Sequence, residues 1–184
     1  MQIAIDGPAG AGKSTLAKKI AANYKMTYLD TGAMFRTIAL RLGPGAEALP
    51  EDELRARCKA FRFKLQGGGE HSVLLCNGVP VGPEIRTEEV GRLASRLATS
   101  TVVRDCLKEA QRSLGESGLV AEGRGIGRIV EAAGQRQACR ARHLQRADKA
   151  HRRCRPVIAT GQSPMQRHRQ LVVTVAKHLA TDLH

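Results

Sequence analysis

Residues 2–24 read QIAIDGPAGAGKSTLAKKIAANY, and this stretch decides the fold. Its first five residues form a short apolar run that predicts a buried strand. Residues 7–14, GPAGAGKS, follow at once and match the phosphate-binding pattern G-x-x-x-x-G-K-[ST]. The next predicted helix has an apolar face made by Leu16, Ala17, Ile20 and Ala21. A strand, a glycine loop and a helix in this order predict an α/β protein that binds a phosphate group.

The loop suits a polyphosphate for physical reasons. Glycines let backbone N–H groups surround a phosphate where side chains would obstruct it, and the following helix N-terminus adds partial positive charge. Lys13 can reach the β and γ phosphates as a catalytic cation, and the Ser14 hydroxyl can bind Mg²⁺ as a metal ligand. The predicted nucleotide-binding residues are Gly7, Pro8, Ala9, Gly10, Ala11, Gly12, Lys13, Ser14 and Thr15. The loop alone does not distinguish a kinase from a GTPase or an ATPase.

A second strand and helix follow this loop. Residues 27–29 predict the strand, and an apolar face between Met34 and Leu42 predicts the helix. Thr31 and Arg36 lie near the helix start, where a hydroxyl and a guanidinium could hold a second phosphate. The alternative is a helix cap next to a solvated arginine, and these two residues alone do not decide between them.

A small antiparallel insert is predicted at about residues 61–86. Residues 61–65 alternate between apolar and polar, and Asn77-Gly78 is a strong hairpin signal between two further apolar runs. Thr87 is a good N-cap for the helix that follows, and a second amphipathic helix ends near Leu114. Residues 119–121 predict another buried strand. A surface hairpin without a function is the alternative interpretation of the insert.

Residues 5–15, IDGPAGAGKST, and residues 28–36, YLDTGAMFR, together resemble the bacterial cytidylate kinases, which are P-loop nucleoside-monophosphate kinases. The resemblance runs from about residue 2 to residue 124. It implies a parallel P-loop kinase sheet with flanking helices and a β insert on the CMP side. It also implies a cytoplasmic, monomeric enzyme that transfers the γ-phosphoryl group of ATP to CMP or dCMP with Mg²⁺. The substrate-binding residues that it implies are Thr31, Arg36, Ser95, Arg104 and Arg124, of which Arg124 is also catalytic.

The last third of the chain has a different composition. Residues 1–123 contain 17 Lys and Arg against 14 Asp and Glu, whereas residues 124–184 contain 13 against 3, a net charge of +10. The family has an Asp where this chain has Gly125, which predicts weaker discrimination of CMP from UMP or AMP. After Val130 the family pattern is lost, and the only later apolar runs are 156–159 and 171–176. We therefore expect a kinase core at 1–124 and a divergent basic segment at 125–184. The sequence leaves the fold class of the basic segment open. A frame change, a fusion and strong divergence are the alternative origins of this segment.

Composition also limits the function. The 184 residues are 42% hydrophobic, which suits one folded domain, and only 3% aromatic, which argues against a base-stacking surface. No apolar run approaches the ~20 residues of a membrane span, and five scattered cysteines suit a reducing compartment. We expect small-molecule nucleotides as partners, without a membrane or a nucleic acid. The alternatives are a nucleotide-binding remnant with impaired catalysis and a nucleic-acid binder that acts through residues 124–184.

Overall fold

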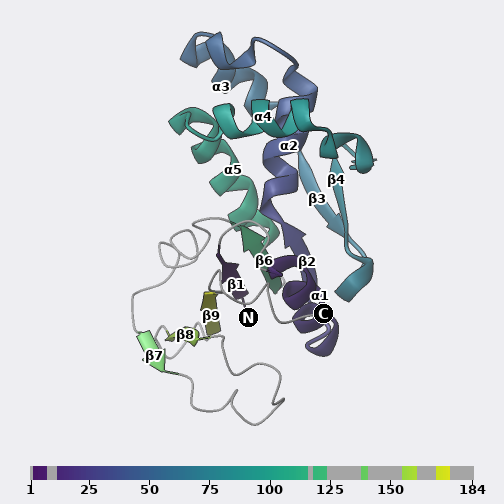
Figure 1. Cartoon of the computed structure of the whole chain (residues 1–184), viewed down its shortest axis with the longest axis vertical. Helices are drawn as coiled ribbons and strands as arrows, with labels where there is room; N and C mark the ends of the chain where they lie inside the picture. Colours follow the sequence, from purple (N-terminus) through teal and green to yellow (C-terminus); the bar gives the residue numbers. More distant parts are fainter. Residues whose placement is uncertain are drawn as a thin grey trace. The chain divides into compact units, whose positions relative to one another are not determined.

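The computed structural model describes residues 2–7, 12–115 and 118–123, together with the backbone of three later strands. The described residues belong to two compact units. The first unit draws on Met1–Leu29, Gly68–Glu70 and Ser117–His184. The second unit draws on Asp30–Gly67 and His71–Glu116, and its helices are labelled α2 to α5 in Figure 1.

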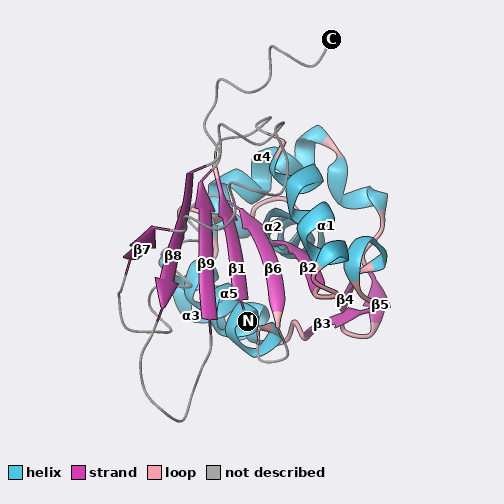
Figure 2. Cartoon of the chain, turned by 90° about the horizontal axis from the view of Figure 1, so that it is seen from below, coloured by secondary structure: helices cyan, strands magenta, loops and turns pink. Residues whose placement is uncertain are grey.

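A six-stranded sheet organises the first unit, in the order β2-β6-β1-β9-β8-β7 (Figure 2). Its strands are β1 (Gln2–Asp6), β2 (Thr27–Asp30), β6 (Leu119–Gly123), β7 (Ala138–Arg140), β8 (Arg155–Thr160) and β9 (Arg169–Thr174). Strand β1 pairs in parallel with both β6 and β9, whereas β8 runs antiparallel to β9 and to β7. The two late apolar runs therefore supply strands β8 and β9 of the main sheet, and β9 lies next to the strand that precedes the phosphate loop.

Strand β1 is buried because parallel neighbours flank it on both sides. Ile3, Ala4 and Ile5 are at most 1% exposed, as expected for a strand of a parallel sheet covered on its faces. Helix α1 (Lys13–Asn23) contributes Ala17 and Ala21 to the same apolar cluster, with Leu16 and Ile20 packed at its edge. The apolar helix face predicted from the sequence is confirmed, and it fixes α1 against the strand that leads into the loop.

The second unit contains helices α2 (Thr31–Leu42), α3 (Glu51–Lys59), α4 (Glu88–Leu97) and α5 (Thr101–Leu114). It also contains the short 3-10 helices η1 (Ala46–Ala48) and η3 (Pro83–Arg86), whereas η2 (Gly69–His71) lies mostly in the first unit. A small antiparallel sheet has the order β3-β4-β5, formed by β3 (Phe63–Gln66), β4 (Val73–Cys76) and β5 (Val79–Pro80). Asn77 and Gly78 close its hairpin with φ of 53° and 81°, the positive values that a tight hairpin turn requires. The predicted antiparallel insert is confirmed.

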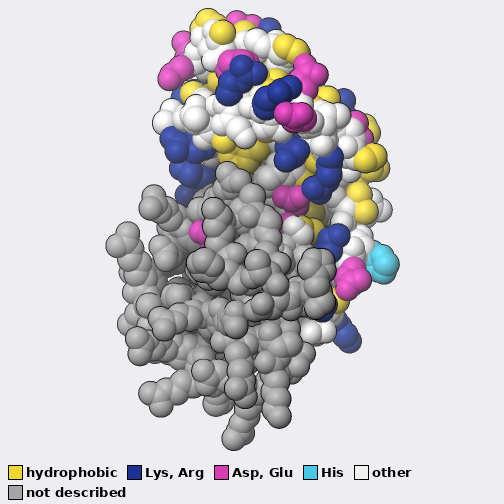
Figure 3. Space-filling view, viewed as in Figure 1, with side chains coloured by type: hydrophobic (Ala, Val, Ile, Leu, Met, Phe, Trp, Pro, Cys, Tyr) yellow, Lys and Arg dark blue, Asp and Glu magenta, His cyan; other side chains and the backbone are white. Residues whose placement is uncertain are grey.

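Helical periodicity explains the packing of the second unit. Helix α2 packs against α4, and α3 packs against α5. The buried residues of α4 recur at the spacing of one helix face: Val90, Leu93, Ala94 and Leu97. Thr87 caps this helix, because its Oγ1 accepts a hydrogen bond from the Val90 N–H at 3.3 Å. The described surface carries basic and acidic side chains interspersed with one another (Figure 3).

These observations confirm the predicted α/β class, with a parallel sheet, flanking helices and an antiparallel insert. The predicted domain boundary at residue 124 lies outside the described residues and stays a prediction. Among the described helices, none is both long enough and apolar enough to cross a membrane.

Candidate functional site

The glycine loop begins directly at the end of β1. The Gly7 N–H donates a hydrogen bond to Oδ1 of Asp6 at 2.8 Å, which turns the chain out of the strand. At the other end, Gly12 is the N-cap of α1 with φ 73° and ψ 13°. This left-handed conformation favours glycine because a Cβ would be strained there. The four predicted loop residues between these glycines, at 8–11, lie outside the described residues.

Three of the predicted nucleotide-binding residues begin α1. Lys13 is half-buried, whereas Ser14 and Thr15 are exposed and open to a ligand. The first turn has no acidic residue, and no described side chain caps it. The positive end of the helix is therefore not neutralised by the side chains of its own first turn, as an anion site requires.

A buried polar contact joins β2 to β6, the strand beside β1. The Tyr28 hydroxyl of β2 donates to Oε1 of Glu122 in β6 at 2.5 Å, and Glu122 is only 3% exposed. Glu122 lies opposite Ile5 in the parallel register, one position before the end of β1. The Lys18 ammonium of α1 lies 5.7 Å from the centre of the Tyr28 ring. The contact therefore fixes the carboxyl ends of the strands, where α/β proteins place their ligand sites.

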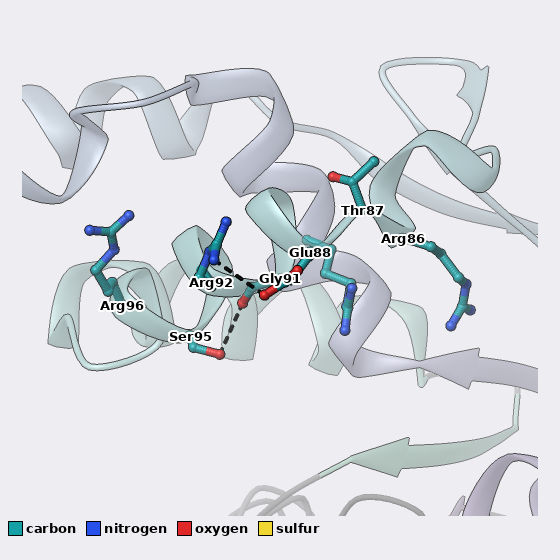
Figure 4. A pocket seen from close by; sticks show the side chains of 8 residues that line it. Arg86, Thr87, Glu88, Gly91, Arg92, Ser95 and Arg96 are labelled. Carbon is teal, nitrogen blue, oxygen red and sulfur yellow. Dashed lines mark hydrogen bonds and ion pairs between the residues drawn. The ribbon is translucent and has the colours of Figure 1, made fainter.

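A hollow of about 800 Å³ lies within the second unit, formed by α2, η3 and α4 (Figure 4). Its lining residues are Arg36, Arg86, Thr87, Glu88, Gly91, Arg92, Ser95 and Arg96. Four arginines against one glutamate make the lining positive, which favours an anionic ligand. The hollow brings together two residues that the family resemblance implies, Arg36 and Ser95.

Arg36 extends from α2 toward η3 and α4. Its Nη1 donates to the Ile85 carbonyl at 3.4 Å, and its guanidinium lies against Gly91. A Cβ at position 91 would be only 3.3 Å from Nη1, so the missing side chain leaves room for the arginine. Arg36, for which the sequence allowed a solvated position, is thus half-buried and held in a defined position.

The four arginines of the hollow differ in their charge partners. Arg86 pairs with Asp30 at 3.3 Å, Arg92 with Glu88 at 3.2 Å and Arg96 with Glu47 at 3.1 Å. Arg36 makes no ion pair with a carboxylate of the described residues. Its charge is available to an incoming anion, and its planar guanidinium matches a phosphate.

The other predicted substrate residues are placed differently. The Ser95 hydroxyl donates to the Gly91 carbonyl at 3.0 Å, and its oxygen can still accept a hydrogen bond (Figure 4). Thr31 is buried at the start of α2, behind the N-cap Asp30, and Arg104 is exposed on α5; neither lines the hollow. Arg124 and Gly125 lie outside the described residues. The predicted set is therefore only partly brought together, and each of its roles stays a prediction.

Three arginines of the hollow, and the contact between Tyr28 and Glu122, were not predicted from the sequence. Arg92 and Arg96 could have been found from their spacing with Glu88, because residues four apart share one face of α4. Glu122 could have been found as a carboxylate within an apolar strand. Across the described residues, no three His, Cys, Asp or Glu side chains gather as a metal site.

A first strand that runs into a glycine loop, followed by a helix that begins with Lys13 and Ser14, defines a P-loop protein of the α/β class. The family model described as "Cytidylate kinase" matches residues 3–182. The chain belongs to the cytidylate kinase family. The match extends well past residue 124, where the resemblance based on sequence motifs ended.

Several curated relatives carry the name "Cytidylate kinase". The protein from Nitratidesulfovibrio vulgaris is 55% identical over 129 residues, which cover 70% of this chain and 56% of the relative. The protein from Lawsonia intracellularis is 51% identical over 129 residues, or 70% of this chain and 57% of the relative. The protein from Oleidesulfovibrio alaskensis is 45% identical over 166 residues, or 88% of this chain and 74% of the relative. The chain thus spans little more than half the length of the first two relatives.

Proposed function

We propose that this chain is a nucleoside-monophosphate kinase that transfers the γ-phosphoryl group of ATP to CMP or dCMP. The products are ADP and CDP or dCDP. The observation that carries this proposal is the hollow of the second unit, which Arg36 and Ser95 both line. Among the described residues, Arg36 has no carboxylate partner there. Family membership and the names of the relatives supply the substrate class.

The phosphate loop is the proposed ATP site. Lys13 would neutralise charge on the β and γ phosphates, while backbone N–H groups of the loop and of the α1 N-terminus hold them. Phosphoryl transfer requires little covalent chemistry from the protein, so positioning and electrostatic stabilisation supply most of the acceleration. Arg124 remains the second proposed catalytic cation.

The start of α1 also fits Mg²⁺. Ser14 presents an exposed hydroxyl in the first turn, and Mg²⁺ prefers oxygen ligands that include substrate phosphates. Ser14 is therefore the residue that would hold the ion. When bound, Mg²⁺ reduces the negative charge of the phosphates.

The hollow is the proposed acceptor site. Arg36 would bind the monophosphate as a two-pronged donor, held in place by the Ile85 carbonyl and by the space above Gly91. Ser95 would bind a polar group of the nucleoside. Arg86, which pairs with Asp30, adds positive charge to the same hollow. Thr31 and Arg104 remain proposed substrate contacts.

The assay that tests this proposal measures ADP formation from ATP in the presence and absence of CMP. We expect CMP-dependent turnover that Lys13→Ala abolishes. Lys19→Ala, which removes an exposed lysine from the same helix, should leave it unchanged. Turnover that survives Lys13→Ala would disprove the assigned role of the loop. ATP-dependent thermal stabilisation without CMP-dependent turnover would instead identify a nucleotide-binding remnant.

Base choice is a separate part of the proposal. Because Gly125 has no side chain, it cannot supply the hydrogen-bond partner that the family's Asp offers to cytosine. We expect kcat/KM for CMP to exceed that for UMP or AMP by less in the wild type than in Gly125→Asp. An unchanged preference in that variant would show that residue 125 does not select the base.

We also infer from the family resemblance that the enzyme is cytoplasmic and monomeric. Light scattering of the purified chain at micromolar concentration would test the second statement. A mass near 19.9 kDa is expected, and a stable mass of twice that value would contradict it.

A further inference from the structure

Two cysteines meet inside the second unit, between α3 and α5. Cys58 lies in the last turn of α3 and is 3% exposed, whereas Cys106 on α5 is half-buried. The two helices pack against each other, and the Cys106 thiol lies near enough to Cys58 to contribute to the raised pKa of that thiol. Cys106 follows Val102 and Val103 by four and three residues, which places it on the buried face of α5. Helix packing therefore brings the two sulfur atoms together.

The two thiols differ in their access to solvent, and Cys58 has a raised pKa. Burial, with a smaller contribution from Cys106, raises the pKa of Cys58 to about 11. Cys58 is therefore a protonated thiol at neutral pH, and solvent reaches it poorly. Cys106 is the thiol that a dissolved oxidant can reach. A thiol of high pKa is a strong nucleophile once it loses its proton, so Cys58 suits a second attack on a neighbouring sulfur.

We propose that Cys58 and Cys106 form a reversible redox pair, which a low-molecular-weight disulfide RSSR oxidises to a cross-link between α3 and α5. The Cys106 thiolate attacks one sulfur of RSSR, which forms a mixed disulfide and releases RS⁻. The Cys58 thiol then loses its proton and attacks the Cys106 sulfur, which releases the second RS⁻. The protein loses two electrons and two protons, and the oxidant becomes two RSH. This proposal does not depend on the proposed kinase activity.

The cross-link would change the stability of the second unit. It would close a loop from residue 58 to residue 106, a segment that contains η3 and α4. A bond that closes a long loop stabilises the fold mainly by restricting the unfolded chain. Cys58 lies one residue before the end of α3, where the backbone can adjust more easily to disulfide geometry than it can in a helix centre.

The test uses the full-length chain and oxidised glutathione at pH 8. Cleavage after glutamate places the two cysteines in separate peptides, residues 54–70 and residues 90–109. Mass spectrometry without reduction should find these peptides joined, with a loss of two hydrogen atoms, and dithiothreitol should separate them. In Cys106→Ser, Cys58 should stay a thiol, and the peptides should not join.

Thermal unfolding supplies a second readout. Oxidation should raise the Tm of the wild type by about 5 °C or more and should leave the Tm of Cys106→Ser unchanged. Cys58→Ala, which keeps a small apolar side chain at the buried position, should behave in the same way as Cys106→Ser. A glutathione adduct that persists on Cys106, two free thiols after prolonged oxidation, or a lower Tm of the oxidised wild type would each overturn the proposal.

Discussion

We propose that the two units of the molecule offer a phosphate group different kinds of partner. In the first unit the partners are backbone groups and a helix N-terminus, which follow a glycine in the left-handed conformation at Gly12. In the second unit the partner is a side chain, Arg36, which extends over Gly91 into a hollow lined by further arginines. A backbone site depends on local chain conformation, whereas a side-chain site depends on how several elements pack.

The polar contacts of the two units differ in their exposure to solvent. Tyr28 and Glu122 are buried in the first unit, so their hydrogen bond is shielded from water. The ion pairs of the second unit have exposed partners, as in Arg92–Glu88. Exposed pairs contribute at most ~1 kcal/mol to stability. The charged side chains of the hollow therefore contribute little to stability and are better suited to binding a ligand.

The largest effect is expected from Lys13→Ala in the first unit. Loss of this cation from the transferred phosphates should lower kcat by about 10²-fold or more, with little change in the KM for CMP. Steady-state kinetics at saturating ATP will measure both values. If kcat fell and the KM for CMP rose by the same factor, the proposal that the first unit acts on ATP and the second unit binds CMP would be wrong.

The second effect is expected from Arg36→Ala. A charge-assisted hydrogen bond to phosphate contributes ~1.5–3 kcal/mol, so the KM for CMP should rise by roughly 10–100-fold while the KM for ATP stays constant. Arg92→Ala is the matched control, because Arg92 lines the same hollow but is already paired with Glu88. If both variants raise the KM equally, then the available charge of Arg36 has no special role.

Tyr28→Phe should lower the free energy of unfolding by about 1.5–3 kcal/mol, because it leaves a buried carboxylate without the Tyr28 donor. Tyr24→Phe is the control, since Tyr24 is 53% exposed and should change stability little. Urea unfolding of both variants will show the difference. Equal stabilities would mean that the contact contributes nothing to the sheet.

Alkaline pH should destabilise the chain through Cys58 under reducing conditions. The folded thiol keeps its proton up to a pKa of about 11, whereas the unfolded thiol ionises near its ordinary value of 9.0. The stabilisation is therefore complete below pH 9 and is lost as pH rises toward 11, by about 1–3 kcal/mol. The stability difference between wild type and Cys58→Ala should shrink over this interval. A constant difference would contradict the raised pKa.

The smallest effect is expected at the start of α4, beside the hollow. Thr87→Ala removes the cap of the Val90 N–H and should cost ~1 kcal/mol of stability, whereas Thr87→Ser should cost much less. Thermal unfolding will compare the two variants. An equal loss in both would show that the hydroxyl is not the stabilising group.

The sequence predicted the features that depend on local pattern. The alternation of residues 61–65 and the Asn77-Gly78 turn predicted the antiparallel insert, and the apolar spacing in α1 predicted its buried face. The pairing of β9 with β1 was not predicted, because it joins strands far apart in the sequence and no local pattern fixes their register. The ion pair between Arg96 and Glu47 was also not predicted, since it joins elements far apart in the sequence.

The residues of the candidate site also differ in whether a local sequence pattern could predict them. The G-x-x-x-x-G-K-S pattern is typical of phosphate binding, so roles for Lys13 and Ser14 could be predicted from the sequence alone, and they stay predictions. The hollow is assembled from α2, η3 and α4, so helical spacing could group Arg92 with Arg96, but only packing shows that they lie with Arg36 and Arg86. Thr31 and Arg104 followed from family resemblance, and their positions outside the lining of the hollow leave their roles to be measured.

The central claim is that the chain moves a phosphoryl group from ATP to CMP. The most direct measurement incubates the full-length chain with Mg²⁺, CMP and ATP labelled at the γ phosphate, and separates the labelled products. The account predicts labelled CDP at a rate equal to that of ADP formation, and almost none with Lys13→Ala. Label found only in inorganic phosphate, or retained in ATP while CMP is present in excess, would contradict the account.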